Sequence, residues 1–546
     1  MSTDYETADE QRLRELGYKQ ELKRELTSFT NFSVSFSVIS ILTGLSSLYG
    51  VGLNTGGPAV IIFGWIVVSF MTFLVALSMA EICSSYPVSS GLYFWSSRLA
   101  GDRGPFFAWI TGWMNLVGEV AVTAGIDFGL AMLLCSVVSL GTGWVYERWH
   151  VVLVYWALLI VHASINTFAV KLIGILNTIS VWVHIGGVII ILAVLAAKTP
   201  NKPTAEWVFT TFINNTGWDS PVYVALIGLL QSQFTMTGYD ASAHMSEETK
   251  NSAVSSPVGI LMAVGVSFVA GLAYLLALTF SIQDLDKVLN SSTGNAITQI
   301  FLDSVGQTGA ILLLCILLLA QFFCGNASVT ANSRMIYAFS RDNALPGSKY
   351  LHRIHPTLKV PVNAVWLAAF LAGLLGILHI INQYAFPAIT SIATIALYIS
   401  YVIPTFCRIT YSRNTFERGP IHLGPFSTVI GAAACIWVAF ITVLFVLPGS
   451  YPVTTQNMNW TIVILAAAVI FVLAYWQISA HKWFKGPQSN VDLEESQFHA
   501  SDMDVKEKDV VVVPAPEVAT AGPGHKTDIH EDADAKNAPG GDKTEL

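Results

Sequence analysis

The sequence predicts an all-α polytopic membrane protein with twelve transmembrane helices. Hydrophobic residues make up 53% of its 546 residues and charged residues only 12%, which is too little charge to cover a soluble protein of this length. Uncharged apolar stretches recur from about residue 32 to residue 480, and each can cross a hydrocarbon core, which takes about 20 helical residues. Lys and Arg gather in alternate segments between these stretches, a pattern typical of membrane proteins.

The lengths of the apolar stretches define the expected spans, and the spans divide the chain into three regions. We expect the twelve spans at about residues 32–53, 57–82, 107–138, 151–166, 172–197, 222–242, 257–281, 305–330, 361–382, 386–408, 427–447 and 459–480. Residues 1–30 then form an N-terminal segment, residues 31–485 the membrane domain and residues 486–546 a tail. The tail holds 14 acidic and 5 basic residues, so it accounts for the net charge of −8 and is predicted to be disordered.

The distribution of positive charge predicts the orientation. If the N-terminus lies in the cytosol, the segments on that side hold nineteen Lys and Arg residues, whereas the outside segments hold four, namely Arg148, Lys198, Lys202 and Lys287. Because cytosolic loops carry the excess of positive charge, both termini are predicted to be cytosolic. The plasma membrane is the expected location, with an organelle membrane as the alternative.

Short motifs outside the spans add two expectations. Sequons at Asn214, Asn290 and Asn459 fall in segments assigned to the outside by charge, and they are candidate glycosylation sites. The C-terminal Thr544 and Leu546, with a free carboxylate, fit a ligand of a PDZ-type domain, although the tail can equally be a solvated extension. The acidic tail offers no basic patch for nucleic acid, so no nucleic-acid partner is expected.

Two spans contain glycine and hydroxyl residues where a plain membrane anchor needs none. These residues are Gly44, Ser46 and Ser47 in ILTGLSSLYGVGLNTGG of the first span, and Thr235, Thr237 and Gly238 in FTMTGYD of the sixth. Backbone groups freed from a helix in lipid are costly unless they line a cavity or meet a ligand. Breaks five spans apart match an inverted five-helix repeat with discontinuous helices 1 and 6, whose half-helix ends can hold a carboxylate. The alternative is close helix crossing, which also favours small residues.

Buried acids within spans are the second candidate for function, because charge inside a membrane is costly. Glu119 and Asp127 in the third span lie about 80° apart around a helix, so both can face one cavity, with Asn115 on the same side. Proton coupling or recognition of a substrate amine competes here with a satisfied buried polar pair. Asp240 in the sixth span can either join such a cavity or cap the second half of its helix.

The eighth span continues as CGNASVTANSRM, which places Asn326 on a helix that can line the central pathway or hold helices together. His162, His184 and His379 each stand alone among apolar residues, so no metal site is predicted. No nucleophile elbow, zinc-binding spacing or phosphate-binding glycine loop is present, so we expect neither an enzyme nor a cofactor.

Six segments together resemble one known family. They are YKQELKRELTSFTNFSVSFS, ALSMAEICSSYPVSSGLYFWS, WITGWMN, FTMTGYDASAHMSEET, NSRMIYAFSRDNALP and VPVNAVW. They resemble the amino acid–choline branch of the amino acid–polyamine–organocation (APC) superfamily, and within it the plant bidirectional amino-acid transporters and GABA permeases. The resemblance runs from about Leu13 to Pro487. At one position the pattern departs, since the plant transporters carry glutamine where this chain has Glu119.

The resemblance implies a LeuT-type fold with repeats at about residues 31–197 and 222–408, followed by two further helices at about 427–480. It implies substrate binding by Gly44, Ser46 and Ser47 at the first break, and by Phe234, Thr235, Thr237 and Gly238 at the second.

The implied function is transport of amino acids or related amines such as GABA by alternating access, either facilitative or coupled to protons. Two alternatives remain open on the same fold. They are a choline or polyamine carrier, and a nutrient-sensing receptor that does not transport. An ion channel is disfavoured, because the filter-like TMTGYD occurs once and a potassium filter needs four copies around an axis.

Overall fold

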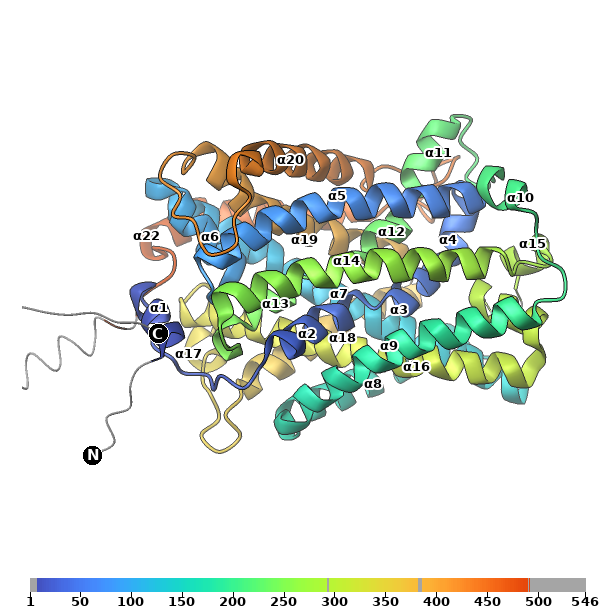
Figure 1. Ribbon diagram of the computed structural model, residues 1–546, viewed down its shortest axis with the longest axis horizontal. Coiled ribbons are helices and arrows are strands. Elements are labelled where there is room, and N and C mark those ends of the chain that lie inside the picture. The colour runs from blue at the N-terminus through green and yellow to red at the C-terminus, as the bar shows by residue number, and fades with distance from the viewer. Residues whose placement is uncertain (1–6, 292–293, 382–384, 490, 492–546) are drawn as a thin grey trace, which may run out of the picture. The chain divides into compact units, whose positions relative to one another are not determined.

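The computed structural model describes residues 7–291, 294–381, 385–489 and 491 (Figure 1). Within these residues the regular structure is helical, and strand-like pairing is confined to two isolated bridges, Leu26 with Thr249 and Thr55 with Asn214. The chain divides into a unit at Met1–Val491, which holds every described residue, and a unit at Asp492–Leu546. The predicted tail therefore lies almost entirely outside the described residues.

In the described part of the chain, eleven helical segments are long and apolar enough to cross a membrane, and each coincides with a predicted span. They are α2 (Ser28–Ile39) with α3 (Ile41–Ser47), α5 (Gly57–Ser85), α7 (Gly104–Thr142), α8 (Arg148–Phe168), α9 (Val170–Lys198), α14 (Ser252–Thr279), α16 (Ala296–Arg341), α18 (Val362–Ile381), α19 (Ala385–Thr410), α20 (Ser427–Leu444) and α21 (Thr461–Tyr475). The prediction of an all-helical polytopic membrane protein is thus confirmed.

Short helices connect these segments. They are α1 (Ala8–Glu15), α4 (Tyr49–Asn54), α6 (Gly91–Leu99), η1 (Gly101–Arg103), α10 (Ala205–Thr210), α11 (Pro221–Ile227), α12 (Leu230–Thr235), α13 (Ala241–His244), η2 (Ser246–Glu248), α15 (Leu285–Leu289), α17 (Ser348–Leu351), η3 (Gly424–Phe426), η4 (Trp476–Ala480) and α22 (His481–Trp483).

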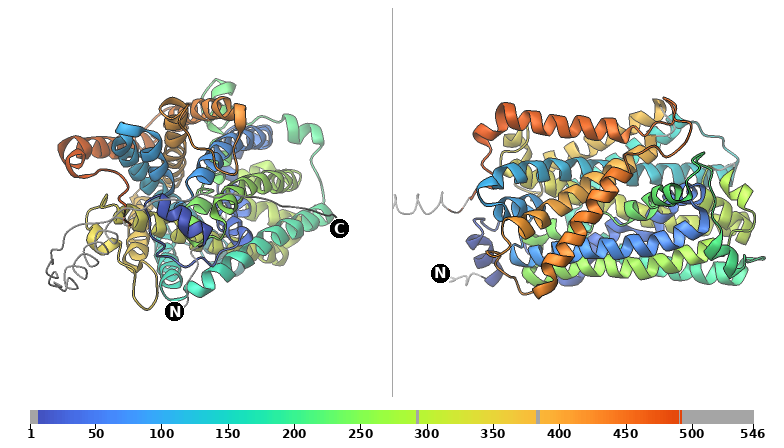
Figure 2. Two further views of the ribbon diagram at one scale, coloured as in Figure 1. Left: turned by 60° about the vertical axis from the view of Figure 1, so that its left-hand side comes forward. Right: turned by 90° about the horizontal axis from the view of Figure 1, so that it is seen from above.

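The long helices run side by side, so their bundle has two ends (Figures 1 and 2). One end carries α1, α6, α17 and α22, and we call it the α1 end. The opposite end carries α4, α10, α11 and α15, and we call it the α10 end. Large apolar side chains such as Phe70, Trp182 and Ile436 are 62 to 71% exposed on the flanks of the helices, which suits contact with lipid.

The first span is interrupted at Ser40, nearer its start than predicted. Ser40 has left-handed backbone angles (φ 39°, ψ 72°) between α2 and α3. Gly44, Ser46 and Ser47 therefore lie in the short helix α3 and not in an unwound stretch, which corrects the predicted position of the break. At the break, the Ser40 hydroxyl lies 2.6 Å from Thr43 Oγ1 and 2.7 Å from His184 Nε2.

The predicted sixth span is three short helices and not one long helix. α11 begins at Pro221, capped by the Ser220 hydroxyl, and α12 ends at Thr235. The chain then turns through Gly238, whose φ of +83° is a conformation that glycine adopts at little cost, before α13 begins. The interruption coincides with the predicted Thr237–Gly238 position, and it explains why this segment is absent from the eleven continuous ones.

α16 is much longer than the predicted span at residues 305–330. It runs from Ala296 to Arg341 and bends at Gly306, whose backbone is not helical (φ 74°, ψ 177°). The polar stretch beyond the apolar part stays helical because neighbouring helices satisfy its side chains. For example, Thr330 donates to Asn166 Oδ1 at 2.6 Å.

Candidate substrate pathway

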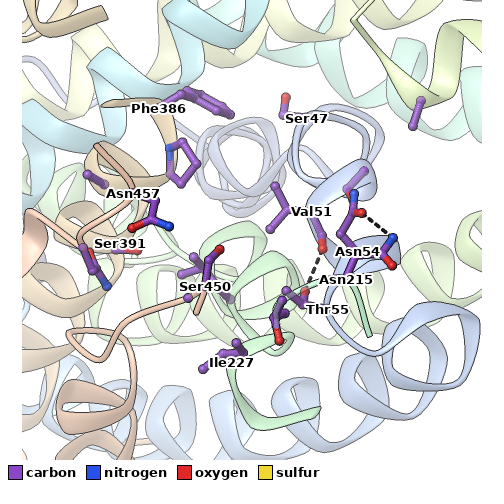
Figure 3. Close-up of a pocket in the computed structure, with 18 of the residues that line it drawn as sticks. Ser47, Val51, Asn54, Thr55, Asn215, Ile227, Phe386, Ser391, Ser450 and Asn457 are labelled. Carbon is purple, nitrogen blue, oxygen red and sulfur yellow. Dashed lines mark hydrogen bonds between the residues drawn. The ribbon is translucent and has the colours of Figure 1, made fainter. Parts of the chain in front are cut away.

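A cavity of about 560 Å³ enters the bundle from the α10 end, and we call it the vestibule (Figure 3). Ser47 and Phe386 lie at its inner part, and loop residues such as Asn215 and Asn457 lie at its rim. Across the rim, the Asn215 side chain donates to Asn54 Oδ1 at 2.9 Å, which ties the loop after α10 to the end of α4. All the described residues that line the vestibule are uncharged.

A smaller space of about 10 Å³ lies beyond the vestibule, and we call it the central pocket. Five of the seven residues predicted to bind substrate line it, namely Gly44, Ser47, Phe234, Thr235 and Thr237. The structure thus brings α3 and α12 together, although their residues are far apart in the chain. The pocket has room for about one water molecule, so a larger solute enters only when side chains such as that of Phe234 move.

The two remaining candidates lie beside this pocket. Ser46 lines the vestibule, and its hydroxyl is 2.7 Å from the Tyr274 hydroxyl. Gly238 directly follows the pocket residue Thr237, and a Cβ atom on it would lie 2.2 Å from Cγ1 of Val38. The break in the sixth segment therefore packs tightly against the end of α2, next to the break at Ser40.

Two tyrosines of α19 hold the second break. The Tyr398 hydroxyl donates to the Met236 carbonyl at 2.5 Å, and the Gly238 N–H donates to the Tyr401 hydroxyl at 3.1 Å. Both hydroxyls thus partner backbone groups that the interrupted helix leaves free. Sequence reasoning missed these tyrosines, and their spacing of one helical turn in an apolar span is the signal that could have found them.

His184 of α9 forms a hydrogen bond with Ser40 at the first break. Its Nδ1 lies 2.7 Å from the Ser180 carbonyl oxygen, which can only accept, so Nδ1 carries the hydrogen. Nε2 then accepts from the Ser40 hydroxyl at 2.7 Å. His184 was expected to stand alone, and this bond to the side chain of Ser40 at the break corrects that expectation.

Glu119 and Asp127, which the sequence allows to face one cavity, have different neighbours in the structure. Asp127 Oδ1 lies 2.8 Å from Nδ1 of His162 on α8, and both side chains are fully buried. Gly325 makes this contact possible, because a Cβ atom there would lie 2.5 Å from Asp127 Oδ1. His162 is therefore not isolated either.

Glu119 lies near Asp240, which accepts a hydrogen bond from Asn115 Nδ2 at 3.2 Å. Asp240 is the residue that precedes α13, but its side chain makes no capping bond to that helix. Asn326 does not line the vestibule or the central pocket, since its side-chain oxygen accepts from Asn166 Nδ2 at 3.1 Å. This bond joins α16 to α8.

The α1 end is closed by the N-terminal segment and by ion pairs. Leu26 exchanges backbone hydrogen bonds of 2.9 Å with Glu248, the last residue of η2, and with Lys250. Glu247 lies 3.4 Å from Arg341, and Glu248 lies 2.8 Å from Arg334, so two arginines of α16 grip η2. We call this set of contacts the latch.

Asp342, at the edge of the latch, accepts hydrogen bonds from the hydroxyls of Tyr93 and Tyr18 and from the Gln488 N–H. Burial raises the pKa of the Asp342 carboxyl above its ordinary value of 3.8, although nearby Arg341 and these donors oppose the rise. Such a group favours folding fully below its unfolded pKa, and this contribution is lost as pH rises through the folded pKa.

Asp342→Asn should therefore flatten part of the pH dependence of stability. We expect the melting temperature of the wild-type protein to contain a component that falls as pH rises from about 4 toward neutral, and we expect the variant, which cannot ionise, to lack it. Melting curves of the detergent-purified protein across this range check the prediction. Asp286→Asn, on exposed α15, should keep the wild-type profile. An identical profile in Asp342→Asn would contradict it.

A bundle of spanning helices with an uncharged cavity leading to two facing helix breaks defines a membrane carrier of small solutes. The chain belongs to the amino acid permease family, whose model matches residues 29–469. It is 44% identical to amino-acid permease BAT1 of Arabidopsis thaliana, over 88% of this chain and 96% of that protein. It is 45% identical to a rice homologue of that permease, with the same coverage. It is 31% identical to the GABA-specific permease of Saccharomyces cerevisiae, over 88% of this chain and 86% of that protein.

The expected amino-acid transport function is thereby confirmed, and the family is one of transporters and not of enzymes.

Proposed function

We propose that this amino-acid transporter works by alternating access and binds its substrate in the central pocket. The observation that supports this is the convergence of Gly44, Ser47, Phe234, Thr235 and Thr237 on one space between two interrupted helices. In this conformation the vestibule reaches toward that space from the α10 end, whereas the latch closes the α1 end. Opening the latch while the vestibule collapses would expose the same pocket to the other side.

The substrate we propose is a small amino acid with no net charge, or a similar zwitterion such as GABA, the substrate named for the yeast relative. The described residues that line the vestibule and the central pocket include no Asp, Glu, Lys, Arg or His. A cation such as choline or a polyamine would enter this membrane-depth site without a carboxylate partner, which is costly. A zwitterion can instead satisfy both its charges on backbone groups at the two breaks.

The proposed topology has twelve membrane crossings arranged as a LeuT-type inverted repeat. The segment formed by α11, α12 and α13 would supply the sixth crossing. The α1 end would face the cytosol, as the positive-charge rule predicts. In support, Asn459 lines the vestibule, Asn214 directly precedes the vestibule residue Asn215, and Asn290 directly follows α15, so all three sequons lie at the α10 end. Location in the plasma membrane and a PDZ-type partner for the C-terminus remain expectations.

Flux measurements with purified protein in liposomes test the proposal. Labelled neutral amino acids, GABA, choline and a polyamine should be compared in counterflow, in which unlabelled solute inside drives entry of labelled solute. We expect saturable counterflow for one or more zwitterions and none for the cations. A protein that binds a zwitterion but gives no counterflow would be a receptor, and counterflow of choline or polyamine alone would contradict the zwitterion assignment.

Ending the chain after Val491 should leave transport per molecule within about twofold of the full chain, because a polar segment of the tail's composition buries little apolar surface. The Gln488 N–H donates to Asp342 at 3.0 Å, which supports a boundary beyond Gln488. Ending the chain after Lys485 is the matched control, and it should lower thermal stability because that bond is lost. Uptake normalised to protein in the membrane checks both, and a correctly inserted Val491 truncation without transport would contradict the separation.

A further inference from the structure

We propose that Glu119, Asp240 and His244 form a proton-binding site, and that Tyr401 couples the site to the helix break at Gly238. The proposal rests on the proposed transport function and identifies the ion that would be coupled to it. One side-chain ligand atom from each of the three residues lies within 4.8 Å of the other two. All three side chains are buried, on α7 and at α13.

The contacts of His244 favour a proton between its imidazole and the carboxyl group of Asp240. His244 Nδ1 is 3.1 Å from the Ser89 carbonyl oxygen, which only accepts, so Nδ1 carries a hydrogen. Nε2 faces Asp240 Oδ2 at 3.4 Å. With neutral histidine and ionised aspartate, two lone pairs would face each other in a buried site. The contact becomes attractive when a proton sits on either Nε2 or the carboxyl group.

The charge balance calls for a second proton. Two carboxyl groups share the site with one imidazole. In the described part of the chain no Lys or Arg forms an ion pair with Glu119 or Asp240. Even with His244 protonated, two carboxylates would leave one net negative charge in the interior of the bundle, which is costly. Binding a proton from water removes that charge, and releasing it to water restores it.

The other titratable groups around the site do not supply a positive charge that would balance the two carboxylates. Tyr401 of α19 donates to Asp240 Oδ1 at 2.6 Å, and the ring of Tyr239 lies 4.9 Å from that of Tyr401. The nearest charged pair linked to the site is Glu247 with Arg341, in which Glu247 Oε1 accepts from the Ser89 N–H at 3.1 Å. Arg341 already pairs with the carboxylate of Glu247.

Tyr401 connects the site to the substrate pathway. Its hydroxyl donates its one hydrogen to Asp240 and accepts the Gly238 N–H at 3.1 Å. When Asp240 is ionised, this bond is charge-assisted and fixes the hydroxyl where Gly238 needs an acceptor. When Asp240 is protonated, the bond weakens and the constraint on the break relaxes. The protonation state of the site is thereby linked to the conformation of the turn beside the central pocket.

Proton movement and substrate movement should be measured together in liposomes that contain a trapped pH indicator, with the zwitterion that gives counterflow as the probe. For the wild-type protein we expect substrate entry to carry protons and the uptake rate to depend on pH. In Glu119→Gln and in Asp240→Asn, the proton signal divided by that variant's own counterflow rate should fall at least about tenfold, and the pH profile should flatten. The acid-to-amide change Glu206→Gln, on exposed α10, is the matched control and should keep both.

Tyrosine variants test the coupling separately. Tyr401→Phe removes the link between Asp240 and Gly238, so the ratio of protons to substrate should fall. Tyr398→Phe, which loses its bond to Met236 on the same break but makes none to Asp240, should slow transport with that ratio unchanged. Equal ratios in the two variants would overturn the role of Tyr401.

The outcomes distinguish this inference from the proposed function. Wild-type counterflow without accompanying protons, or an unchanged ratio in both Glu119→Gln and Asp240→Asn, would overturn the proton site and leave the transport proposal intact. Absence of counterflow for every zwitterion in the wild-type protein would overturn the transport proposal itself.

Discussion

Gly238→Val should abolish transport while the protein still reaches the membrane. Gly238 has a φ of +83°, and a Cβ atom there would lie 2.2 Å from Val38 Cγ1, closer than real Cβ contacts come. A side chain in this conformation costs about 1–2 kcal/mol, and forcing it against the end of α2 adds typically 1–3 kcal/mol. Both costs fall on the turn beside the central pocket. Counterflow per molecule should drop below about a tenth of the wild-type rate, since 1.4 kcal/mol corresponds to tenfold.

Matched glycine variants separate strain from steric conflict. Gly347→Val has a similar φ of +75° but no heavy atom within 4 Å of its Cβ position, so it should retain most of its transport. Gly44→Val should also fail, because its Cβ position lies 2.8 Å from Thr235 Cγ2, whereas Gly186→Val meets open space. Normal uptake by Gly238→Val or Gly44→Val would exclude the tight contact at that position as part of the transport site.

Arg341→Ala should open the α1 end. The side chain of Glu247 is fully buried and that of Arg341 is 10% exposed, so the substitution leaves a buried carboxylate without its cation. Breaking such a pair costs about 3–5 kcal/mol. The arginine also stacks on the Tyr18 ring at 4.3 Å, so its loss loosens the N-terminal segment as well. We expect the population with an open α1 end to rise at least about a hundredfold and substrate uptake from the α10 end to fall.

Cys83 provides a native probe of this opening, because it is buried on α5. Its labelling by a thiol reagent, measured by mass spectrometry, should accelerate in Arg341→Ala. The double variant Glu247→Gln with Arg341→Gln removes both charges and should restore slow labelling. Lys287→Ala, which breaks an exposed ion pair with Asp284, should have little effect. Unchanged labelling in Arg341→Ala would show that this pair does not hold the α1 end closed.

The spans and the second break were predictable because their causes are local. Apolar length determines whether a segment can cross a membrane, and glycine in TMTGYD marks a turn by its own backbone preference. In the latch, Glu247 and Glu248 stand at a helix end next to an apolar span. Their partners Arg334 and Arg341 could not be assigned, because pairing depends on how α16 extends past its apolar part.

The first break could not be placed from sequence because its cause is distant in the chain. The left-handed conformation of Ser40 depends on His184, which is 144 residues away. The different neighbours of Glu119 and Asp127 could not be predicted for a related reason. Their angular separation on α7 allows a shared cavity, but Gly325 of α16 admits His162 to Asp127 and draws that carboxylate to a different neighbour. Angles around one helix therefore do not decide which neighbouring helix each face meets.

The continuity of α16 gives the molecule a mechanical lever. From the bend at Gly306 to Arg341 the helix is unbroken, which at 1.5 Å per residue is roughly 50 Å, longer than a hydrocarbon core is thick. Gln321, beside the central pocket, and Arg341, in the latch, are therefore parts of one stiff body. A tilt of this rod that widens the pocket must also displace the arginines that grip η2. In the proposed transport cycle, this rigid geometry would join filling of the pocket to release of the far end, without a chain of side-chain rearrangements between them.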